Sequence, residues 1–402
     1  MRILAITNCF PCPSSPLRAL FHLHKMRAMA KENQVRLIVP VPWPEQLRHR
    51  LRGGAASLEF NEPNLRVYYP TYWFTPRILQ HRYGGFFLAS IRGAVRDALR
   101  DFQPEIVFAI WSHPDGWAAV QIARELKLPV VIKVIGSDVL VISENPRRRK
   151  MVAEALRAAD HVIAVNRHLA DATVELGVDR GRVHIIQEGI DKQAFQPGDQ
   201  QQARGLLGLP KEGRIILFVG NLLFSKGAGV LIDACSILSA KSVPFTCYLV
   251  GRGKDEAKLR QMVKRGNLSK CVVIPGPCRQ DVLVNWYRAC DIVALPSFSE
   301  GIPNVLREAM QCHRPFVATR VGGIPEISDP ATTHLVAPGD ARELAEALEQ
   351  MLQAPPRVDE SVAGRYNITW EQSFQKIKEL FDIALQQHSG SEVPIRETAA
   401  TV

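Results

Sequence analysis

The stretch Leu295-Pro-Ser-Phe-Ser-Glu-Gly-Ile-Pro-Asn-Val-Leu-Arg-Glu308 determines the predicted architecture of the second half of the chain. The apolar run Asp291–Leu295 predicts a buried strand, and Pro303, which suits a first helical turn, predicts a helix after the loop. Loops at the carboxyl ends of parallel strands bind ligands, and N–H groups at a helix start receive phosphate oxygens. The carboxylates of Glu300 and Glu308 can accept hydrogen bonds from sugar hydroxyls. This combination suits a nucleotide-sugar.

The composition predicts a soluble globular protein with an anionic partner. A length of 402 residues predicts two or three domains, and 46% hydrophobic with 22% charged residues is ordinary for such proteins. The net charge of +10 favours nucleotides, phospholipid headgroups or nucleic acid. Because no apolar run reaches the ~18 residues that span a bilayer and the apolar N-terminus is too short for a signal peptide, we expect a cytoplasmic protein with reduced cysteines.

Short apolar runs alternate with helical patterns along the whole chain. The runs that predict strands are Ile3–Thr7, Val35–Val41, Ile106–Trp111, Val130–Ile135, Val162–Val165 and Val183–Ile186 in the first half, and Ile215–Gly220, Phe245–Gly251, Val272–Pro275, Ile292–Leu295, Phe316–Thr319 and Leu335–Val336 in the second. Strands spaced by helices form parallel sheets that are covered on both faces. The sequence therefore predicts an α/β protein with two doubly wound, Rossmann-like domains.

A polar stretch that begins at Gln196 gives the predicted boundary between the domains. We expect the first domain to cover residues 1–195 and the second to cover residues 196–369. Apolar residues at helical spacing predict a helix over residues 370–386 that returns to the first domain. The polar residues 387–402 lack periodicity, so we expect a disordered tail.

Three further sequence features can be interpreted either as functional or as purely structural or solvent-exposed. Lys226 precedes a helix and could neutralise a diphosphate, or it could simply be solvated. His113 follows the third strand, where it could contact a ligand or serve the structure. Cys9 and Cys12 have the spacing of a redox or zinc pair, but the chain has no second pair of that spacing to complete a four-ligand site.

Basic residues cluster at two places in the first half of the chain. Arg147, Arg148, Arg149 and Lys150 begin a predicted helix, and Arg48, Arg50 and Arg52 lie on a predicted loop. Such runs are either solvated faces or contacts to an anionic membrane surface. A nucleic-acid partner is ranked last, because the chain has no recognised binding motif and no basic stripe interleaved with aromatic residues.

In these motifs the chain resembles the retaining nucleotide-sugar glycosyltransferases of family 4, and in particular those of teichuronic-acid and exopolysaccharide biosynthesis. The resemblance extends to about Leu385, and its most specific part is the E-x7-E signature Glu300-Gly-Ile-Pro-Asn-Val-Leu-Arg-Glu308. Supporting motifs are Val219-Gly-Asn-Leu with Lys226-Gly227, Tyr248-Leu-Val-Gly-Arg-Gly253, Val321-Gly-Gly-Ile-Pro-Glu326, His113-Pro-Asp-Gly116, Gly136-Ser-Asp138 and Gly189-Ile-Asp191. The fold implied is GT-B, with two Rossmann-like domains facing across a cleft.

The resemblance also implies roles for individual residues. Glu300 and His113 would contact the transferred sugar, Lys226 would bind the diphosphate, and Glu308 would hold the ribose hydroxyls. The rest of the donor would lie against Gly220, Asn221, Gly251, Gly276, Cys278, Gly301, Ile302, Asn304 and Val305. The donor would be a UDP- or GDP-sugar and the acceptor a lipid-linked or polysaccharide molecule, with no metal and no other cofactor, consistent with the missing D-x-D motif.

Several positions depart from the family pattern. Asn221 stands where the family often has Arg, Ile135 where it has His, Glu188 where it has Asn and His313 where it has Gly. The Pro13-Ser-Ser-Pro16 segment replaces a glycine pair. Glu188 would repel the phosphates unless it points away from them. A catalytically weak or inactive nucleotide-sugar-binding scaffold protein of a polysaccharide assembly complex is therefore the alternative to an active transferase. Donor base, sugar, acceptor, linkage and oligomeric state do not follow from the sequence.

Overall fold

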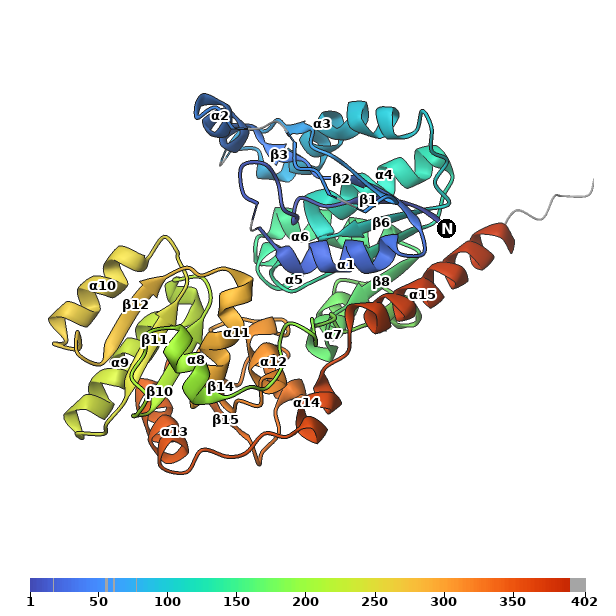
Figure 1. The fold of residues 1–402 in the computed structure, drawn as a ribbon. Helices are drawn as coiled ribbons and strands as arrows, with labels where there is room; N and C mark the ends of the chain where they lie inside the picture. The colour runs from blue at the N-terminus through green and yellow to red at the C-terminus, as the bar shows by residue number, and fades with distance from the viewer. Residues whose placement is uncertain (17, 55–56, 61, 77, 391–402) are drawn as a thin grey trace, which may run out of the picture. The chain divides into compact units, whose positions relative to one another are not determined.

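The computed structural model describes residues 1–390 except 17, 55–56, 61 and 77 (Figure 1). The chain forms two compact units: Met1–Gly189 together with the chain from Trp370 onward, and Ile190–Thr369. The division lies before the predicted position at residue 195. The reason is local, because Ile190 and Phe195 are buried in the core of the second unit and the N–H of Ile190 donates to the carbonyl of Ile368 at 2.8 Å.

The first unit contains a seven-stranded parallel sheet in the order β4-β2-β1-β6-β7-β8-β9. Its strands are β1 (Arg2–Ile6), β2 (Gln34–Ile38), β4 (Leu65–Tyr68), β6 (Ile106–Ile110), β7 (Val130–Lys133), β8 (His161–Ala164) and β9 (Val183–Ile185). The edge strand β4 is absent from the sequence prediction. A separate pair, β3 (Val41–Pro42) with β5 (Thr71–Tyr72), adds two short parallel strands. The strand order reverses between β1 and β6.

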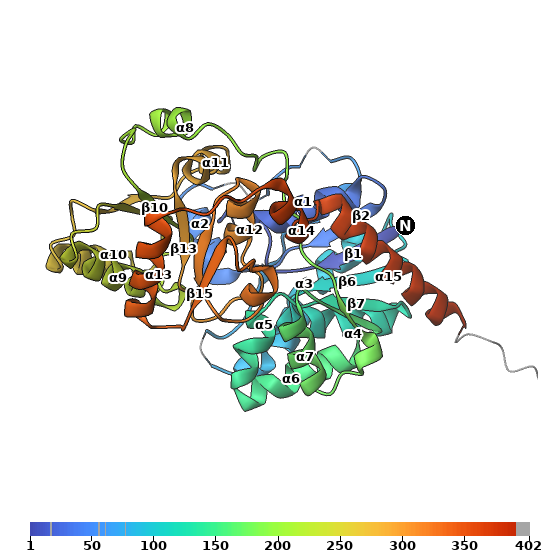
Figure 2. The same cartoon turned by 90° about the horizontal axis from the view of Figure 1, so that it is seen from below.

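Alternate residues of β1 point into two different cores of the first unit. Ile3 and Ala5 pack with helices α1 (Leu20–Ala30) and α15 (Trp370–Gly390), and both views place these helices alongside each other (Figures 1 and 2). Leu4 and Ile6 pack on the opposite face. The helices that contribute to that face are α3 (Tyr83–Ala98), α4 (Trp117–Leu126), α6 (Pro146–Ala158) and α7 (Arg167–Glu175), with the short α5 (Ser137–Leu140) also in this unit.

The second unit contains a six-stranded parallel sheet in the order β12-β11-β10-β13-β14-β15. Its strands are β10 (Ile215–Val219), β11 (Thr246–Val250), β12 (Val272–Gly276), β13 (Ile292–Leu295), β14 (Phe316–Thr319) and β15 (Thr333–Val336). Its helices are α8 (Gln200–Leu206), α9 (Ala228–Ala240), α10 (Glu256–Arg265), α11 (Gln280–Ala289), α12 (Asn304–Gln311), α13 (Ala341–Gln353) and α14 (Glu360–Tyr366). The first strand and the fourth lie side by side at the centre, so the order reverses between β10 and β13.

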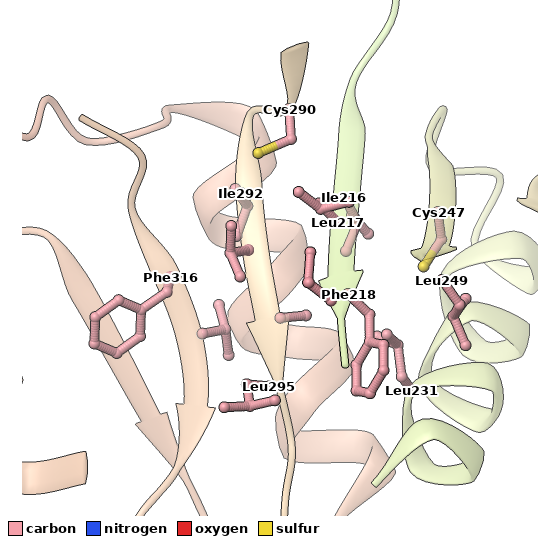
Figure 3. Packing of buried hydrophobic residues seen from close by; sticks show 14 of the residues in the cluster. Ile216, Leu217, Phe218, Leu231, Cys247, Leu249, Cys290, Ile292, Leu295 and Phe316 are labelled. Carbon is pink, nitrogen blue, oxygen red and sulfur yellow. The ribbon is translucent and has the colours of Figure 1, made fainter. Parts of the chain in front are cut away.

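The core of the second unit fixes the two central strands against each other. Figure 3 shows Ile216 and Phe218 of β10 beside Ile292 and Leu295 of β13, with Leu231 of α9 packed near Phe218. Each of these side chains is at most 2% exposed, and burial of a side chain of this size contributes roughly 1.5–3 kcal/mol. The carboxyl ends of β10 and β13 are therefore held rigidly next to each other.

Three elements differ in their extent from the sequence predictions. Arg48 and Arg50 lie on helix α2 (Trp43–Leu51) rather than on a loop, and α15 continues through Gly390. The predicted disorder is thus wrong for residues 387–390, and residues 391–402 lie outside the described residues. Pro303 precedes α12 as its N-cap instead of opening the helix. Among the described helices, none has the length and apolar character needed to cross a bilayer.

Candidate active site

The loop after β10 carries Lys226 to the carboxyl edge of the second sheet. The loop starts at Gly220, contains the short 3-10 helix Phe224–Lys226 and ends at Gly227, from which α9 begins. Gly227 has a φ of 72°, and a Cβ at this position would lie 1.8 Å from the carbonyl oxygen of Pro296. Only glycine fits there, because the loops after β10 and β13 touch backbone to backbone.

The loop after β13 brings Glu300 to the same place. Its Oε1 accepts hydrogen bonds from the ammonium of Lys226 at 2.8 Å and from the hydroxyl of Ser297 at 2.7 Å. Side-chain exposure is 32% for Lys226 and 10% for Glu300, so the lysine remains accessible at the surface. An ammonium has three N–H donors, of which this pair uses one.

A third loop, after β14, supports the backbone of Glu300 from the other side. A Cβ on Gly322 would lie 1.8 Å from the carbonyl oxygen of Glu300, and the N–H of Gly323 donates to the carbonyl of Gly301 at 2.8 Å. The loops of three adjacent strands therefore meet where the strand order reverses. In doubly wound sheets this is the position at which ligands bind.

Two helices begin beside this pair with their first N–H groups available. Neither α9, preceded by Gly227, nor α12, preceded by Pro303, has a side-chain cap, and neither has an acidic residue in its first turn. Helix N-termini carry partial positive charge and unsatisfied donors, which favour a bound anion. Asn304 and Val305 form the first turn of α12, and Ile302 lies in the loop just before it. The arrangement favours phosphate oxygens.

Glu308 lies one turn further along α12 and is held by a tyrosine. The hydroxyl of Tyr287 on α11 donates to its Oε2 at 2.6 Å. Although part of the residue reaches the surface, burial of its carboxyl raises the pKa of Glu308 to about 7, against the lowering effect of the Tyr287 hydrogen bond. Its other oxygen, Oε1, is not used by this bond. When it is ionised, Glu308 can therefore accept a hydrogen bond from a hydroxyl group of a ligand.

The predicted nucleotide-contacting residues after β10, β11 and β12 cluster along one edge. The N–H of Gly251 donates to the carbonyl of Gly276 at 3.0 Å, and a Cβ on Gly251 would lie 1.9 Å from the carbonyl oxygen of Gly220. Asn221 follows Gly220 with an exposed side chain, and Cys278 is partly buried just after β12. The structure thus brings the predicted residues of the second unit to the carboxyl ends of neighbouring strands.

His113 belongs to the first unit and is fully buried there. Its ring lies against α3, where a Cβ on Gly84 would be 3.3 Å from its Nε2, and among the described residues neither ring nitrogen has a hydrogen-bond partner. Burial lowers the pKa of His113 to about 4, with a smaller effect from Arg148. The imidazole is therefore neutral at pH 7. Its contact with a sugar stays a prediction.

Two buried aspartates hold the loops around His113. Asp115 accepts from the N–H of Asn8, and burial raises the pKa of this carboxyl well above its usual range. Asp138 accepts from the N–H groups of Ser112, Ile135 and Gly136 at 2.9–3.1 Å. Burial raises the pKa of Asp138 to about 6, while these bonds lower it. Both side chains accept from the protein's own backbone and so hold these loops in place.

Glu188, a departure from the family pattern, is paired inside the first unit. Its Oε1 lies 2.7 Å from Nζ of Lys25 and 3.2 Å from Nζ of Lys133, and the Nζ of Lys25 lies 3.3 Å from Nδ1 of His22. All four residues are buried, and we call them the buried charge cluster. Burial would raise the pKa of Glu188, but the two lysines lower it below its usual range. The carboxylate is thus neutralised within its own unit.

The sequence prediction missed the partners in both units. Ser297 and Tyr287 support Glu300 and Glu308, but a serine in a loop and a tyrosine in a helix carry no signal of their own. Lys133 does carry one, because it ends an apolar strand in which a lysine is unexpected. That position could have been recognised as a buried ion-pair site.

The cysteine pair lies on the segment that follows β1. Cys9 and Cys12 are both free, and the Cys9 thiol lies 3.2 Å from the side-chain oxygen of Asn8. Burial raises the pKa of Cys9 above its usual range, which disfavours the reactive thiolate. Within the described part of the chain, no group of three or more His, Cys, Asp and Glu side chains is arranged to hold a metal ion.

Comparison with protein families decides the family of this chain. The model of "Glycosyltransferase Family 4" matches residues 22–194, and that of "Glycosyl transferases group 1" matches residues 213–354. The chain belongs to glycosyltransferase family 4. The two matches together cover most of both units of this glycosyltransferase.

Two bacterial relatives are similar to this family 4 glycosyltransferase. D-inositol 3-phosphate glycosyltransferase 2 of Catenulispora acidiphila is 35% identical over 233 residues, which are 54% of this chain and 55% of the relative. The match therefore spans only about half the length of that relative. The putative teichuronic acid biosynthesis glycosyltransferase TuaC of Bacillus subtilis is 28% identical over 364 residues, 87% of this chain and 88% of the relative.

Solved structures confirm the predicted GT-B fold of this glycosyltransferase. Sucrose-phosphate synthase from Thermosynechococcus elongatus has a TM-score of 0.79 at 19% identity, covering 96% of this chain and 100% of that one. Anabaena HepE, solved in complex with UDP and glucose, has a TM-score of 0.73 at 19% identity, covering 95% of this chain and 99% of that one. At this identity the likeness shows the fold alone.

Proposed function

We propose that this protein transfers a sugar from a nucleotide-diphosphate-sugar to a lipid-linked or polysaccharide acceptor, with retention of anomeric configuration. The observation that carries the proposal is the pair of Lys226 and Glu300, joined at 2.8 Å across the point where the strand order of the second sheet reverses. The pair lies on the loops that contain the E-x7-E signature and the Lys-Gly motif of the family.

The donor binds along the carboxyl edge of the second sheet. Lys226 and the N-termini of α9 and α12 bind the diphosphate, since they combine a cation with free N–H groups. Glu308 accepts the ribose hydroxyls, and Glu300 accepts hydroxyls of the transferred sugar. Residues 276–278, at the end of β12, lie against the base. HepE was solved with UDP and UDP-glucose, which supports a uridine nucleotide as the first donor to test.

The chemistry follows from the charge that develops on the leaving group. As the bond between the anomeric carbon and the phosphate oxygen breaks, negative charge grows on the nucleoside diphosphate. Lys226 and the helix N–H groups stabilise that charge more in the transition state than in the ground state. The acceptor hydroxyl attacks from the face that the phosphate leaves, and its proton passes to a departing phosphate oxygen. This scheme uses the chain's own cation, and no metal ion or other cofactor takes part in it.

Polysaccharide or lipid-linked acceptors fit the similarity to TuaC, whose printed name assigns it to teichuronic acid biosynthesis. We propose that the acceptor is presented at the inner face of the cytoplasmic membrane. The basic start of α6, where Arg147, Arg149 and Lys150 are exposed and Arg148 is half-buried, is a candidate contact to anionic lipid. We propose a cytoplasmic protein that associates with this surface peripherally.

Donor turnover tests the proposal directly. The purified chain is incubated with a panel of UDP- and GDP-sugars, and release of the nucleoside diphosphate is measured with and without lipid-linked acceptors. Thermal shifts with the same panel report binding, because ligand stabilises the folded state by RT ln(1 + [L]/Kd). We expect both a shift and turnover with one donor, and loss of turnover in Glu308→Ala. Binding without turnover under every condition would favour the scaffold alternative, and full activity of Glu308→Ala would refute the site.

A further inference from the structure

Helix α2 of the first unit turns its leucines to solvent. Leu51 is 78% exposed and Leu47 is 49% exposed, and no residue of the helix is buried. A helix on the surface of a globular protein normally packs its apolar stripe on the core and exposes its polar face. In α2 this order is reversed.

Hydrogen bonds and an ion pair hold α2 in this orientation, with its leucines outward. Glu45 accepts from the guanidinium of Arg18 at 2.6 Å and from the hydroxyl of Ser14 at 2.7 Å. Gln46 accepts from the hydroxyl of Thr71 on β5. These bonds tie the polar side of the helix to the rest of the unit. The leucines, which are four residues apart and so on one face, are left on the outer side.

A tryptophan extends the apolar surface next to this helix. Trp73 is 61% exposed and stacks on Trp43 of α2, with ring centroids 6.1 Å apart and planes at 15°. The Nε1 of Trp43 donates to the carbonyl of Phe74, and the N–H of Trp73 donates to the hydroxyl of Ser90, both at 2.9 Å. The exposed indole is therefore fixed beside α2.

Basic residues flank the exposed leucines. Arg48 and Arg50 lie on α2 and Arg52 follows it, and all three are exposed. Successive residues of a helix are 100° apart, so Arg48 and Arg50 lie on opposite sides of the face that Leu47 and Leu51 share. We call Leu47, Leu51, Trp73, Arg48, Arg50 and Arg52 the α2 surface; Figure 1 shows α2 at the margin of the first unit, beside β3.

We propose that the α2 surface docks on an anionic phospholipid bilayer. Charge complementarity selects this partner, because arginines beside a face of leucines match anionic headgroups above an apolar layer. Tryptophan is enriched at the depth where headgroups meet acyl chains. This inference rests on the proposed function: a lipid-linked acceptor lies in a membrane, and docking brings the protein to that membrane. Its test uses no sugar transfer, so the two can fail separately.

Vesicle binding by the full chain tests the proposal. The protein is co-sedimented with vesicles of phosphatidylcholine alone and of phosphatidylcholine mixed with phosphatidylglycerol, without donor. We expect binding to the mixed vesicles only, weakened by salt. Leu47→Ser and Leu51→Ser should each lower the partition coefficient about tenfold, because each removes a side chain whose burial favours the apolar layer. The double change Arg48→Gln with Arg50→Gln should lower it by about tenfold or more.

Matched variants on the second unit control for non-specific hydrophobic adsorption and for the loss of net positive charge. Leu206→Ser removes a leucine that is also highly exposed, on α8, and Lys264→Gln with Arg265→Gln removes two charges from α10. We expect binding unchanged in both. Fluorescence of the native chain should be quenched by brominated lipids, and Trp73→Phe should remove part of that quenching.

Three outcomes would overturn the proposal. The native chain could fail to bind the mixed vesicles, or Leu47→Ser and Leu51→Ser could bind as tightly as the native chain. Binding could also depend only on Arg147 and Arg149 of α6, which would leave α2 outside the membrane contact. Self-association that Leu51→Ser removes, with no vesicle binding, would identify α2 as a protein interface instead.

Discussion

The two sheets of this glycosyltransferase have the same order around their central strands, but they use the charges at their carboxyl ends differently. In the first unit, Asp115, Asp138 and Glu188 are buried and bonded to their own unit. In the second unit, Lys226 stays at the surface, paired with Glu300. At one sheet edge the acidic side chains are bonded to groups of their own unit, whereas the other edge keeps a cation available for a ligand.

This difference between the two sheet edges indicates which charged groups can contribute free energy to ligand binding. A buried charge that is already bonded stabilises its surroundings and would lose those bonds on contact with a ligand. A partly exposed ammonium keeps donors in reserve and loses little by changing partners. Shared topology therefore does not imply a shared site.

Glu188→Gln should destabilise the first unit by about 3–5 kcal/mol. The change leaves Lys25 and Lys133 buried without a countercharge, and breaking a buried pair from one side has this order of cost. Denaturant unfolding checks the prediction. Glu32→Gln, which breaks an exposed ion pair with Lys378 in the same unit, is the control and should leave the stability nearly unchanged. Equal stability of the two variants would show that the buried charge cluster is not strongly coupled.

The buried charge cluster also marks the limit of what the sequence could predict. Lys25 and Lys133 are far apart in the chain, and their pairing with Glu188 depends on α1, β7 and the segment after β9 meeting in space. Lysine is rarely fully buried, so composition and periodicity argue against this arrangement. By contrast, Glu300 and Lys226 were predictable, because each lies in a local motif directly after a recognisable strand.

The fold shows the same division between local and non-local information. Runs such as Ile292–Leu295 were predicted to the residue, since a fully buried parallel strand is apolar throughout. The edge strand Leu65–Tyr68 was missed because only Leu65 is fully buried and its neighbours alternate with polar residues. Helix α2 was missed for another reason: its leucines point outward, so no apolar stripe faces the core.

Lys226→Met should lower turnover about 10²–10³-fold, which corresponds to roughly 3–4 kcal/mol of lost transition-state stabilisation. The ammonium would be missing where charge develops on the leaving diphosphate. Stability should change by less than about 1 kcal/mol, because the ion pair with Glu300 is partly exposed. Initial rates and a denaturation curve for the same preparation give both values.

Lys241→Met is the matched control for Lys226→Met. Lys241 pairs with Glu349 on the surface of the same unit, away from the loops described above. We expect native turnover in this variant. If both lysine variants lost the same activity, a general charge effect would replace the specific role of Lys226.

Gly322→Ala should cost about 1–3 kcal/mol of stability and weaken donor binding. Gly322 has a φ of 52°, and the added Cβ would meet the carbonyl oxygen of Glu300, so the Glu300 loop must move. Gly205→Ala on α8 is the control, because no atom lies within 4 Å of its Cβ and alanine favours a helix. Calorimetric titration with the donor found in the panel measures the effect. Native affinity in Gly322→Ala would show that the loop position does not matter for binding.

The smallest expected effect is the pH dependence of Glu308. Its pKa is raised by burial to about 7, so the folded protein binds more protons than the unfolded chain between the ordinary pKa of 4.5 and 7. Stability from this group is therefore present at low pH and is lost as pH rises through that window. Donor binding should change in the opposite direction, because only the ionised carboxylate accepts both ribose hydroxyls.

At pH 6 a group with a pKa of about 7 is ionised in about one molecule in eleven, so donor affinity should fall by about tenfold at most between pH 8 and pH 6. Glu308→Gln should bind the donor weakly at both values and show no such slope. Calorimetric titrations of both proteins with the donor at pH 6 and pH 8 measure this change in affinity. Parallel pH profiles would mean that Glu308 does not titrate in the donor site, and its role would then be to hold Tyr287 at 2.6 Å rather than to contact the ribose.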